Sequence, residues 1–355
     1  MRESKSDLDS NSALGLGIDA GGTRTRWALA TRAGEIVGEG QGEGLSALQM
    51  TGAAGRQAVQ AGFASLCQAV LSIGQPGRVC AGLSGFGGDG EQLVAWLAGM
   101  LSIRAQDVAL CSDIEIAFLD SFEPGQGYLV YAGTGSIAAF IDRDGQFHRA
   151  GGRGVLLDDG GGGYWIAREA LRHIWRGEDE CPGNWRGSAM AQAVFEQVGG
   201  SDWACSRQFM YGQERGRIGE LALAVAATCD TDPAACHILQ QAGRELARLA
   251  LALTARHGPR PIVLSGRAAG LHPAIAVAMR AALPATFPLR QADTQPHFAA
   301  ARIAAGAGAR AAPSPAPSSA PAPASASASA SAPSASASSS SASTSAIQPR
   351  PAPDL

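Results

Sequence analysis

Short apolar runs separated by glycines open the chain. Leu14–Ile18, Trp27–Ala30 and Ile36–Gly40 are rich in apolar residues, and Gly21-Gly22 stands between the first two runs. Apolar runs of this length that are bounded by glycine turns are typical of β-hairpins. The pattern therefore predicts three consecutive antiparallel strands.

Helical and strand periodicities alternate in the next part of the chain. The predicted elements are a helix over Ala53–Ile73, a strand over Val79–Leu83, a helix over Gly90–Leu101, a strand over Val108–Cys111 and a helix over Ile114–Ser121. Strands that alternate with helices favour a parallel or mixed sheet with helices on its faces.

The strand–glycine turn–strand pattern then begins again. Gly127–Ala132 and Ile137–Asp142 are apolar, Gly133–Ser136 is a turn between them, and Gly145–Arg149 follows. The elements predicted after this unit are helices over Tyr164–Trp175, Met190–Val198, Ile218–Cys229 and Pro233–Ala255, a strand over Pro261–Ser265, and helices over His272–Leu283 and Phe298–Ala307. The duplication predicts two α/β halves whose glycine turns face each other across a cleft.

The two ends of the chain differ from this pattern. Residues 1–13 are polar, and residues 308–355 consist almost wholly of Ala, Ser and Pro, which offer little apolar surface to offset the entropy of ordering. We therefore expect a flexible leader over 1–13, an N-terminal α/β domain over 14–122, a C-terminal α/β domain over 123–307 and a disordered tail over 308–355. A length of 355 residues agrees with about two domains.

Composition and charge argue against two classes of partner, nucleic acids and membranes. The chain is 46% hydrophobic and has a net charge of -3, with 28 Lys and Arg. Nucleic-acid binding usually shows as a basic excess, and a bilayer span needs about 18 consecutive apolar residues. The sequence has neither feature. We expect no nucleic acid and no membrane as partner.

The cysteines and the N-terminus predict the compartment. Seven cysteines are scattered along the chain without a CxxC pair, and no apolar signal core precedes the first strand. An odd, dispersed set of thiols argues against a disulfide framework and against the common zinc spacings. These features predict a cytoplasmic protein.

The two glycine turns are the most informative motifs. In the first, Asp19 precedes Gly21, Gly22, Thr23 and Thr25. Glycines leave the backbone N–H groups open to an anion, threonines add hydroxyl donors, and an Asp at a strand end can hold Mg²⁺ through water. An ordinary hairpin turn is the alternative interpretation.

The second turn repeats this logic in the other half of the chain. It comprises Gly133, Thr134, Gly135 and Ser136. Two such turns in one chain favour a pair of loops that clamp phosphates. The sequence is neither a P-loop, which needs GK[ST], nor a Rossmann turn, which needs GxGxxG at the start of a helix.

These motifs together resemble a known family. The segments GIDAGGTRT, Ser112-Asp113, AGTGS and GGRGVLLDDGGGGYWIAREALR are similar to the BadF/BadG/BcrA/BcrD-type ATPases, and within them to the N-acetylglucosamine and glucosamine kinases. The resemblance runs from Leu14 to Ala307 and is most specific over Gly151–Arg172. It implies two ribonuclease H-like domains of the actin and sugar kinase type around a cleft for ATP and sugar.

The resemblance also implies roles for individual residues. The first motif (Asp19, Gly21, Gly22, Thr23, Thr25) and the second (Gly133, Thr134, Gly135, Ser136) would bind ATP phosphates, with Asp19 on Mg²⁺. Thr134 would also reach the sugar, and Asp159 would bind sugar hydroxyls. Gly266, in Ser265–Ala268, would lie at the adenosine, and Asp113 would be the catalytic base.

Asp113 suits that role on chemical grounds as well. Phosphoryl transfer to a hydroxyl needs a carboxylate that accepts the proton. Because Asp113 directly precedes the predicted helix Ile114–Ser121, the alternative interpretation is a helix N-cap, and one residue can serve both roles.

The sequence departs from the family pattern on the sugar side. Gly44–Ala47 lacks the Pro and Asn of the family's Gly-Pro-x-Asn loop, and Asp158-Asp159-Gly160 stands where the family has Gly-Asp-Glu. Both changes remove polar groups, and the loss of polar partners alters the choice of substrate. ATP binding is therefore better supported than the identity of the sugar.

These observations lead to a main hypothesis and two alternatives. The main hypothesis is an ATP- and Mg²⁺-dependent kinase that phosphorylates the 6-hydroxyl of N-acetylglucosamine or glucosamine. The alternatives are a non-catalytic sensor of sugar or ATP and an ATPase that activates a radical dehydratase. The expected partner is a small-molecule amino sugar, and a homodimer is expected by analogy alone.

Overall fold

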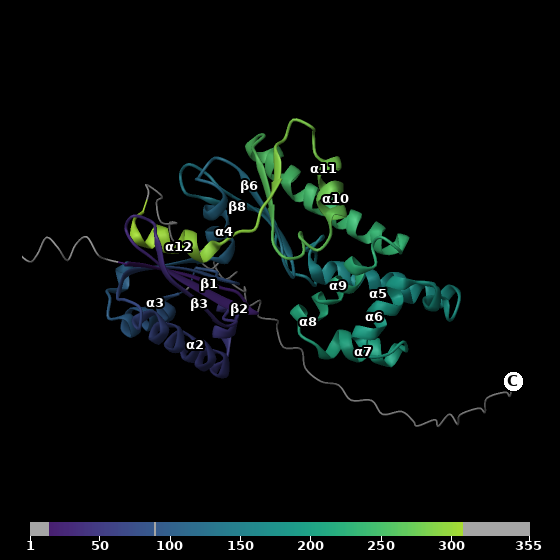
Figure 1. Ribbon diagram of the computed structural model, residues 1–355, viewed down its shortest axis with the longest axis horizontal. Helices are drawn as coiled ribbons and strands as arrows, with labels where there is room; N and C mark the ends of the chain where they lie inside the picture. The colour runs from purple at the N-terminus through teal and green to yellow at the C-terminus, as the bar shows by residue number, and fades with distance from the viewer. Residues whose placement is uncertain (1–13, 89, 308–355) are drawn as a thin grey trace, which may run out of the picture. The chain divides into compact units, whose positions relative to one another are not determined.

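Two five-stranded mixed sheets form the framework of the chain. The computed structural model describes residues 14–88 and 90–307, which belong to one compact unit. Their sheets have the strand orders β3-β2-β1-β4-β5 and β10-β9-β6-β7-β8, each with helices packed against it (Figure 1). The predicted leader and tail lie outside the described residues. Within the described ranges, no helix combines the length and hydrophobicity that crossing a bilayer requires.

The first sheet begins with the predicted hairpins. Its strands are β1 (Leu14–Ala20), β2 (Arg24–Ala30), β3 (Ile36–Glu43), β4 (Pro76–Leu83) and β5 (Val108–Ser112). Strands β1, β2 and β3 are antiparallel neighbours, which confirms that prediction, whereas β4 pairs with β1 in parallel and β5 with β4 in parallel. The accompanying helices are η1 (Ala47–Thr51), α2 (Ala53–Leu71), α3 (Glu91–Leu101), η2 (Ala105–Asp107) and α4 (Asp113–Ser121).

The second sheet repeats this arrangement. Its strands are β6 (Tyr128–Ala132), β7 (Ser136–Ile141), β8 (Phe147–Gly151), β9 (Ile262–Ser265) and β10 (Leu289–Gln291). Strands β6, β7 and β8 are antiparallel, and β9 joins β6 in parallel. The helices are α5 (Gly163–Glu180), η3 (Asn184–Gly187), α6 (Ala189–Val198), α7 (Trp203–Gly212), α8 (Arg215–Gly219), α9 (Leu221–Ala227), α10 (Pro233–His257) and α11 (Pro273–Ala282). Helix α10 packs against β6, β7 and β8.

The structure differs from the sequence expectations at one predicted helix and adds elements that were not predicted, among them the short helices η1, η2 and η3. The helix predicted over Ile218–Cys229 is two helices, α8 and α9, and α7 and β10 are additional. The break between α8 and α9 brings Gly219 against the start of α5, where a Cβ on Gly163 would lie 3.2 Å from Gly219 O. The helix predicted over Ile218–Cys229 is thus confirmed over α9, whereas its continuity through Glu220 was wrong.

The last helix, α12 (Pro296–Ala305), packs on the first sheet. It contacts β1, β2, β4 and α4, and Figure 1 shows it beside the purple strands at the other end of the chain. A Cβ on Gly15 would overlap the main chain of Ala305, and one on Gly17 would overlap that of Ala301 and His297. Alternate residues of a strand share a face, so Asp19 is the next residue on the face that α12 covers. The division into domains at residues 122 and 123 stays a prediction.

We expect Gly17→Ala to destabilise the fold. The added Cβ would meet α12 main chain, which cannot move aside as a flexible side chain can, so the free energy of unfolding should fall by about 1–3 kcal/mol, the usual cost of overpacking. Thermal unfolding would measure the change. The control is Gly42→Ala in β3, where a Cβ would meet nothing within 4 Å. An equal loss in both variants would contradict the prediction.

Candidate active site

The first glycine turn places Asp19 at the end of β1. Gly21 N donates to Arg24 O over 3.1 Å, which closes the turn between β1 and β2. Gly22 is exposed, and a Cβ on it would meet nothing within 4 Å. The turn therefore leaves open space beside its backbone, as an anion-binding loop requires. Thr23 is exposed in the same turn.

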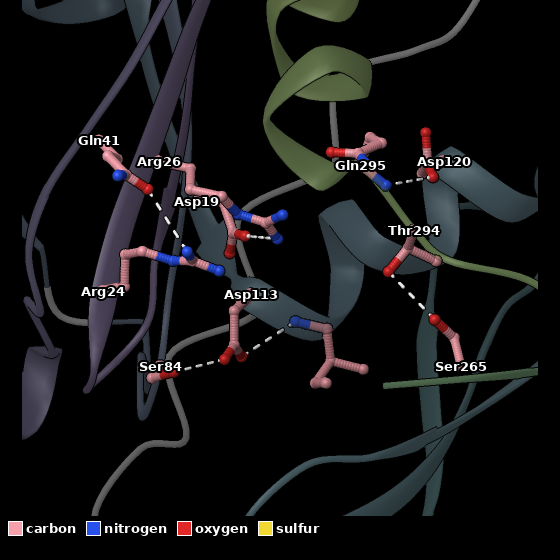
Figure 2. Close-up of polar contacts among 11 residues, drawn as sticks. Asp19, Arg24, Arg26, Gln41, Ser84, Asp113, Asp120, Ser265, Thr294 and Gln295 are labelled. Carbon is pink, nitrogen blue, oxygen red and sulfur yellow. Dashed lines mark hydrogen bonds and ion pairs between the residues drawn. The ribbon is translucent and has the colours of Figure 1, made fainter. Parts of the chain in front are cut away.

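Asp19 forms an ion pair that follows from the hairpin register. Asp19 and Arg26 are register partners in β1 and β2, and Arg26 Nη2 lies 2.8 Å from Asp19 Oδ2 (Figure 2). Desolvation raises the pKa of Asp19, and the guanidinium groups of Arg26 and Arg24 act in the opposite direction. The Asp19 side chain is 14% exposed, so its charge is only partly screened by water.

Thr25 follows Arg24 in β2 and is buried. It is 1% exposed, and its Oγ1 has no hydrogen-bond partner among the described residues. Buried hydroxyls usually have partners. The sequence placed Thr25 in the phosphate motif, and its unsatisfied hydroxyl makes it a candidate for a bond to a ligand or water.

Asp113 is the first residue of α4 but not its cap. Ser112 is the N-cap, because its hydroxyl accepts a hydrogen bond from Glu115 N (3.3 Å) while Glu115 Oε2 accepts one from Ser112 N (2.8 Å). This reciprocal pair is a capping box. The interpretation of Asp113 as the N-cap was therefore wrong, and the Asp113 carboxylate is not needed for that purpose.

The carboxylate of Asp113 has two hydrogen-bond partners. Oδ1 accepts from Ile114 N over 3.0 Å, and Oδ2 accepts from the hydroxyl of Ser84 at the end of β4 (Figure 2). Desolvation raises the pKa of Asp113, the Ser84 hydrogen bond lowers it, and the negative charge of Asp19 raises it. The result is a carboxylate whose pKa is above its usual value, which improves it as a proton acceptor.

Tyr131 on β6 is a site residue that the sequence analysis did not identify. Desolvation raises the pKa of its phenol, and the charges of Asp19 and Asp113 raise it further. Tyr131, near the end of β6, is therefore close enough to Asp19 and Asp113 for their charges to act on its phenol. Neither Tyr131 nor Ser84 stands out in the sequence, because both lie at the end of apolar strands.

The second glycine turn is held by the start of α5. Gly163 N donates to Gly133 O (2.8 Å) and Tyr164 N donates to Thr134 O (3.0 Å), so the helix fixes the turn through backbone bonds. The hydroxyl of Ser136 is buried and donates to Gly160 O over 2.7 Å. Ser136 therefore joins the turn to the glycine-rich loop after β8.

Asp159 lies directly over this turn. Its backbone has a left-handed conformation with φ of 53°, and its Oδ1 accepts from Arg153 N (2.9 Å) and Gly154 N (3.0 Å). A Cβ on Gly135 would overlap Asp159 Oδ2. Desolvation raises the pKa of Asp159, and the two backbone bonds lower it. The structure thus brings together the second turn and the acid that the sequence predicted for sugar binding.

The side chain of Glu245 lies beside Gly160, where the family pattern has an acidic residue. A Cβ on Gly160 would lie 2.9 Å from Oε2 of Glu245, a residue of α10. Glu245 Oε2 accepts from Arg248 Nε over 2.7 Å, and Arg248 Nη2 lies 3.2 Å from Asp158 Oδ2. Arg248 thus links Glu245 of α10 to Asp158 beside the loop.

Gly266 adjoins the other end of the second turn. It has a φ of +100°, and a Cβ on it would overlap Ala132 O, which accepts a bond from Ala268 N (2.9 Å). Ser265 Oγ lies 3.2 Å from Thr294 Oγ1 (Figure 2). The glycine predicted to contact adenosine thus packs against the strand end that leads into Gly133.

One cluster of metal-ligand residue types lies outside these motifs. Ligand atoms of Cys229, Asp230 and His272 lie within 4.8 Å of one another. However, His272 Nδ1 accepts from Ala274 N over 3.2 Å, so the proton of a neutral ring is on Nε2, which faces Asp230 Oδ1 at 3.5 Å. A protonated nitrogen cannot ligate a metal. His272 therefore caps the start of α11 through Nδ1.

A comparison with protein-family profiles shows which family the chain belongs to. The profile of the BadF/BadG/BcrA/BcrD ATPase family matches residues 16–297. The chain belongs to this family. The profile covers both sheets and all of the candidate site residues, which confirms the resemblance recognised in the sequence motifs.

Two curated proteins match shorter segments. The N-acetyl-D-glucosamine kinase of Dictyostelium discoideum is 32% identical over 108 residues, which are 29% of this chain and 33% of that protein. The N-acetylmuramic acid/N-acetylglucosamine kinase of Clostridium acetobutylicum is 33% identical over 73 residues, which are 21% of this chain and 24% of that protein. The matched segments span a third or less of these relatives.

Solved structures show the same fold over nearly their whole length. A protein described as an N-acetylglucosamine kinase from Chromobacterium violaceum has a TM-score of 0.62 at 24% identity, covering 82% of this chain and 98% of the other. A ROK family glucokinase from Streptomyces griseus in complex with glucose and AMPPNP has a TM-score of 0.53 at 16% identity, covering 81% and 98%. The two mixed sheets are thus those of the two-domain sugar kinase fold.

We expect Gly135→Ala and Gly22→Ala to separate structural from ligand-binding roles. In Gly135→Ala the new methyl overlaps Asp159 Oδ2, so the melting temperature should fall by several degrees. In Gly22→Ala the methyl meets no protein atom, so the melting temperature should stay unchanged while Mg-ATP affinity falls about tenfold. Thermal unfolding and calorimetry measure the two effects. Unchanged ATP affinity in Gly22→Ala would remove the phosphate role of the first turn.

We also expect Asp113→Asn to stabilise the protein near neutral pH. An acid whose pKa is raised on folding costs stability above its folded pKa, and this cost vanishes below its ordinary value of 3.8. The variant should therefore have a higher melting temperature than the wild type at pH 7.5 and the same melting temperature near pH 4. Asp142→Asn is the control and should lower the melting temperature at pH 7.5, because a hydrogen bond with His148 lowers the pKa of Asp142. A destabilised Asp113→Asn at pH 7.5 would contradict this account.

Proposed function

We propose that this protein is an ATP-dependent kinase that transfers the γ-phosphoryl group to the 6-hydroxyl of an amino sugar, N-acetylglucosamine or glucosamine. The observation that carries the proposal is the half-buried carboxylate of Asp113, which is released from helix capping by Ser112 and oriented by Ser84. A carboxylate with a raised pKa beside a phosphate-binding turn has the properties of a general base for phosphoryl transfer. The names of the two curated relatives support an amino sugar as acceptor.

ATP would lie between the two glycine turns. A Cβ on Gly22 would meet nothing within 4 Å, so this residue would offer open space for one phosphate group. The N–H groups of Thr134 and Gly135 would face the phosphates from the other half of the chain. Because the Ser136 hydroxyl already donates to Gly160 O, Ser136 would contribute through its backbone N–H group. Gly266 would shape the turn that contacts the adenosine, because its positive φ and its close packing on Ala132 exclude a side chain there.

The residues around Asp19 fit a Mg²⁺ ion. The negative charge of Asp19 raises the pKa of Asp113, and a divalent cation near the two carboxylates would relieve this repulsion. Asp19 would hold the ion through water, and Arg26 is the cation that now neutralises it. When bound, Mg²⁺ would neutralise the charge that develops on the transferred phosphoryl group.

Asp113 and Asp159 would have different roles toward the sugar. Asp113 would accept the proton of the 6-hydroxyl as its oxygen forms the bond to the γ-phosphorus and ADP leaves. Asp159 uses Oδ1 for two backbone N–H groups, which leaves Oδ2 for a sugar hydroxyl next to Thr134. The proposal implies a cytoplasmic enzyme with small molecules as its partners.

A non-catalytic sensor of sugar or ATP is the second candidate. The observation that favours it is the loss of polar groups at Ala47 and Gly160, on the predicted sugar side. An activator of a radical dehydratase is less well supported, because an interfacial iron–sulfur cluster needs accessible thiols. Of the seven cysteines, all in the described part of the chain, Cys181 alone is exposed.

ADP release in the presence of Mg-ATP would test the proposal. The acceptors are glucosamine, N-acetylglucosamine, N-acetylmuramic acid, N-acetylmannosamine and glucose. We expect turnover with an amino sugar and a fall in kcat of about 10²–10⁴-fold in Asp113→Asn, the usual contribution of a general base. The control is Asp158→Asn, at the acid next to Asp159 in the sequence. Its side chain pairs with Arg248, and this variant should retain activity. Binding of sugar or ATP without any turnover would instead establish the sensor.

A further inference from the structure

A cavity outside the candidate active site lies between α5 and α10, two helices that pack against each other (Figure 1). Its volume is about 520 Å³, which is within the range of small-molecule sites. Its α5 residues recur every three or four positions between Trp165 and Glu180 and therefore share one face of the helix. Its α10 residues are His237, Ile238 and Gln241. None of the residues proposed above to bind ATP, Mg²⁺ or sugar lines this cavity.

One arginine in this cavity has no partner for its charge. Glu169 is buried at 8% exposure, and its two carboxylate oxygens form ion pairs with Arg168 (3.4 Å) and Arg172. Arg176 lies about one turn beyond Arg172, and its guanidinium group forms neither a hydrogen bond nor an ion pair with the residues that the structure describes. The charge of Glu169 is thus balanced by two arginines, which leaves Arg176 free to bind an anion.

The middle of the cavity is rich in hydrogen-bond donors. Arg172, His173 and Arg176 lie within about one turn of α5. On α10, Gln241 Nε2 lies 3.4 Å from His237 Nε2, and an amide nitrogen can only donate. The proton of a neutral His237 ring is therefore on Nδ1, which is a further donor. Two guanidinium groups one turn apart suit the oxygens of a phosphate group, which arginine binds through parallel hydrogen bonds.

The residues on either side of these donors limit the rest of a ligand. Trp165, about two turns before Arg172, is partly exposed and offers an aromatic face. Along the helix axis the two residues are about 10 Å apart, a distance that a phosphate joined to a sugar or nucleoside can span. Glu180, one turn beyond Arg176, would repel a second phosphate group. These limits favour a single phosphate on a ring over a polyphosphate.

We propose that this cavity binds a phosphate monoester of a ring compound, with the phosphate on Arg172 and Arg176 and the ring against Trp165. The proposal does not depend on the kinase function proposed above. Helix α5 also holds the second glycine turn through Gly163 N and Tyr164 N, but none of the candidate catalytic acids lines the cavity. The ligand would therefore be an effector and not the substrate.

Calorimetry would test this proposal with ribose 5-phosphate, AMP and inorganic phosphate, each in excess Mg-ADP so that nucleotide does not bind at the candidate active site. The wild type should bind a ring monoester more tightly than inorganic phosphate. Arg176→Ala should weaken that binding about 10–100-fold, the usual contribution of a charge-assisted hydrogen bond. Because Arg176 is exposed and unpaired, the melting temperature should stay unchanged. Arg207→Ala, at an exposed arginine of α7 outside the cavity, is the matched control and should bind as the wild type does.

The outcomes decide both the site and the type of ligand. Weaker binding of either ring compound by Arg176→Ala alone supports the proposal, and the more tightly bound compound shows whether the ligand is a sugar phosphate or a nucleotide. Equal affinities of Arg176→Ala and the wild type, or equal losses in both arginine variants, would overturn it. So would a wild type that binds neither ring compound, or binds both no better than inorganic phosphate.

Discussion

The close contact between α12 and β1 is the constraint on which the candidate site depends. Two glycines in β1, Gly15 and Gly17, let helix and strand main chains touch, and this contact directs the start of α12 toward the end of β1 where Asp19 lies. The same helix packs against α4, where Gln295 N donates to Asp120 Oδ2 over 2.9 Å (Figure 2). One helix therefore fixes the elements that carry both acids of the first sheet, Asp19 and Asp113.

This contact also sets the electrostatics around the acids. His297, in the first turn of α12, has its pKa lowered to about 4 by burial and by the charges of Arg26 and Arg24, so it is neutral at physiological pH. The arginines are consequently the positive charges that balance Asp19. Desolvation and the negative charge of Asp19 raise the pKa of Asp113, and a bound cation would offset this repulsion between the two carboxylates. Such an arrangement suits the phosphoryl transfer proposed above.

The sequence predicted most elements because apolar periodicity reports burial, and it predicted the glycine turns because backbone that approaches a ligand needs glycine. It did not predict where the last helix packs, since a strand with two glycines has the same periodicity whichever helix covers it. The cap at Ser112 was recognisable from Glu115 three residues later, and the Arg26 partner of Asp19 follows from a two-stranded register. Ser84 and Tyr131 gave no signal, because only the meeting of distant segments makes them site residues.

The position of α12 has a consequence for how the protein is made. The first sheet is complete in sequence once α4 ends at Ser121, yet the helix that covers Gly15 and Gly17 begins only at Pro296. At about 5–20 residues per second, a ribosome needs on the order of ten to thirty seconds for the intervening chain. During that time the face of β1 that carries Gly15 and Gly17 lacks its covering helix. The first sheet therefore cannot complete its packing until the chain has been synthesised through α12, which ends at Ala305. A chain truncated before α12 would leave this face of β1 uncovered.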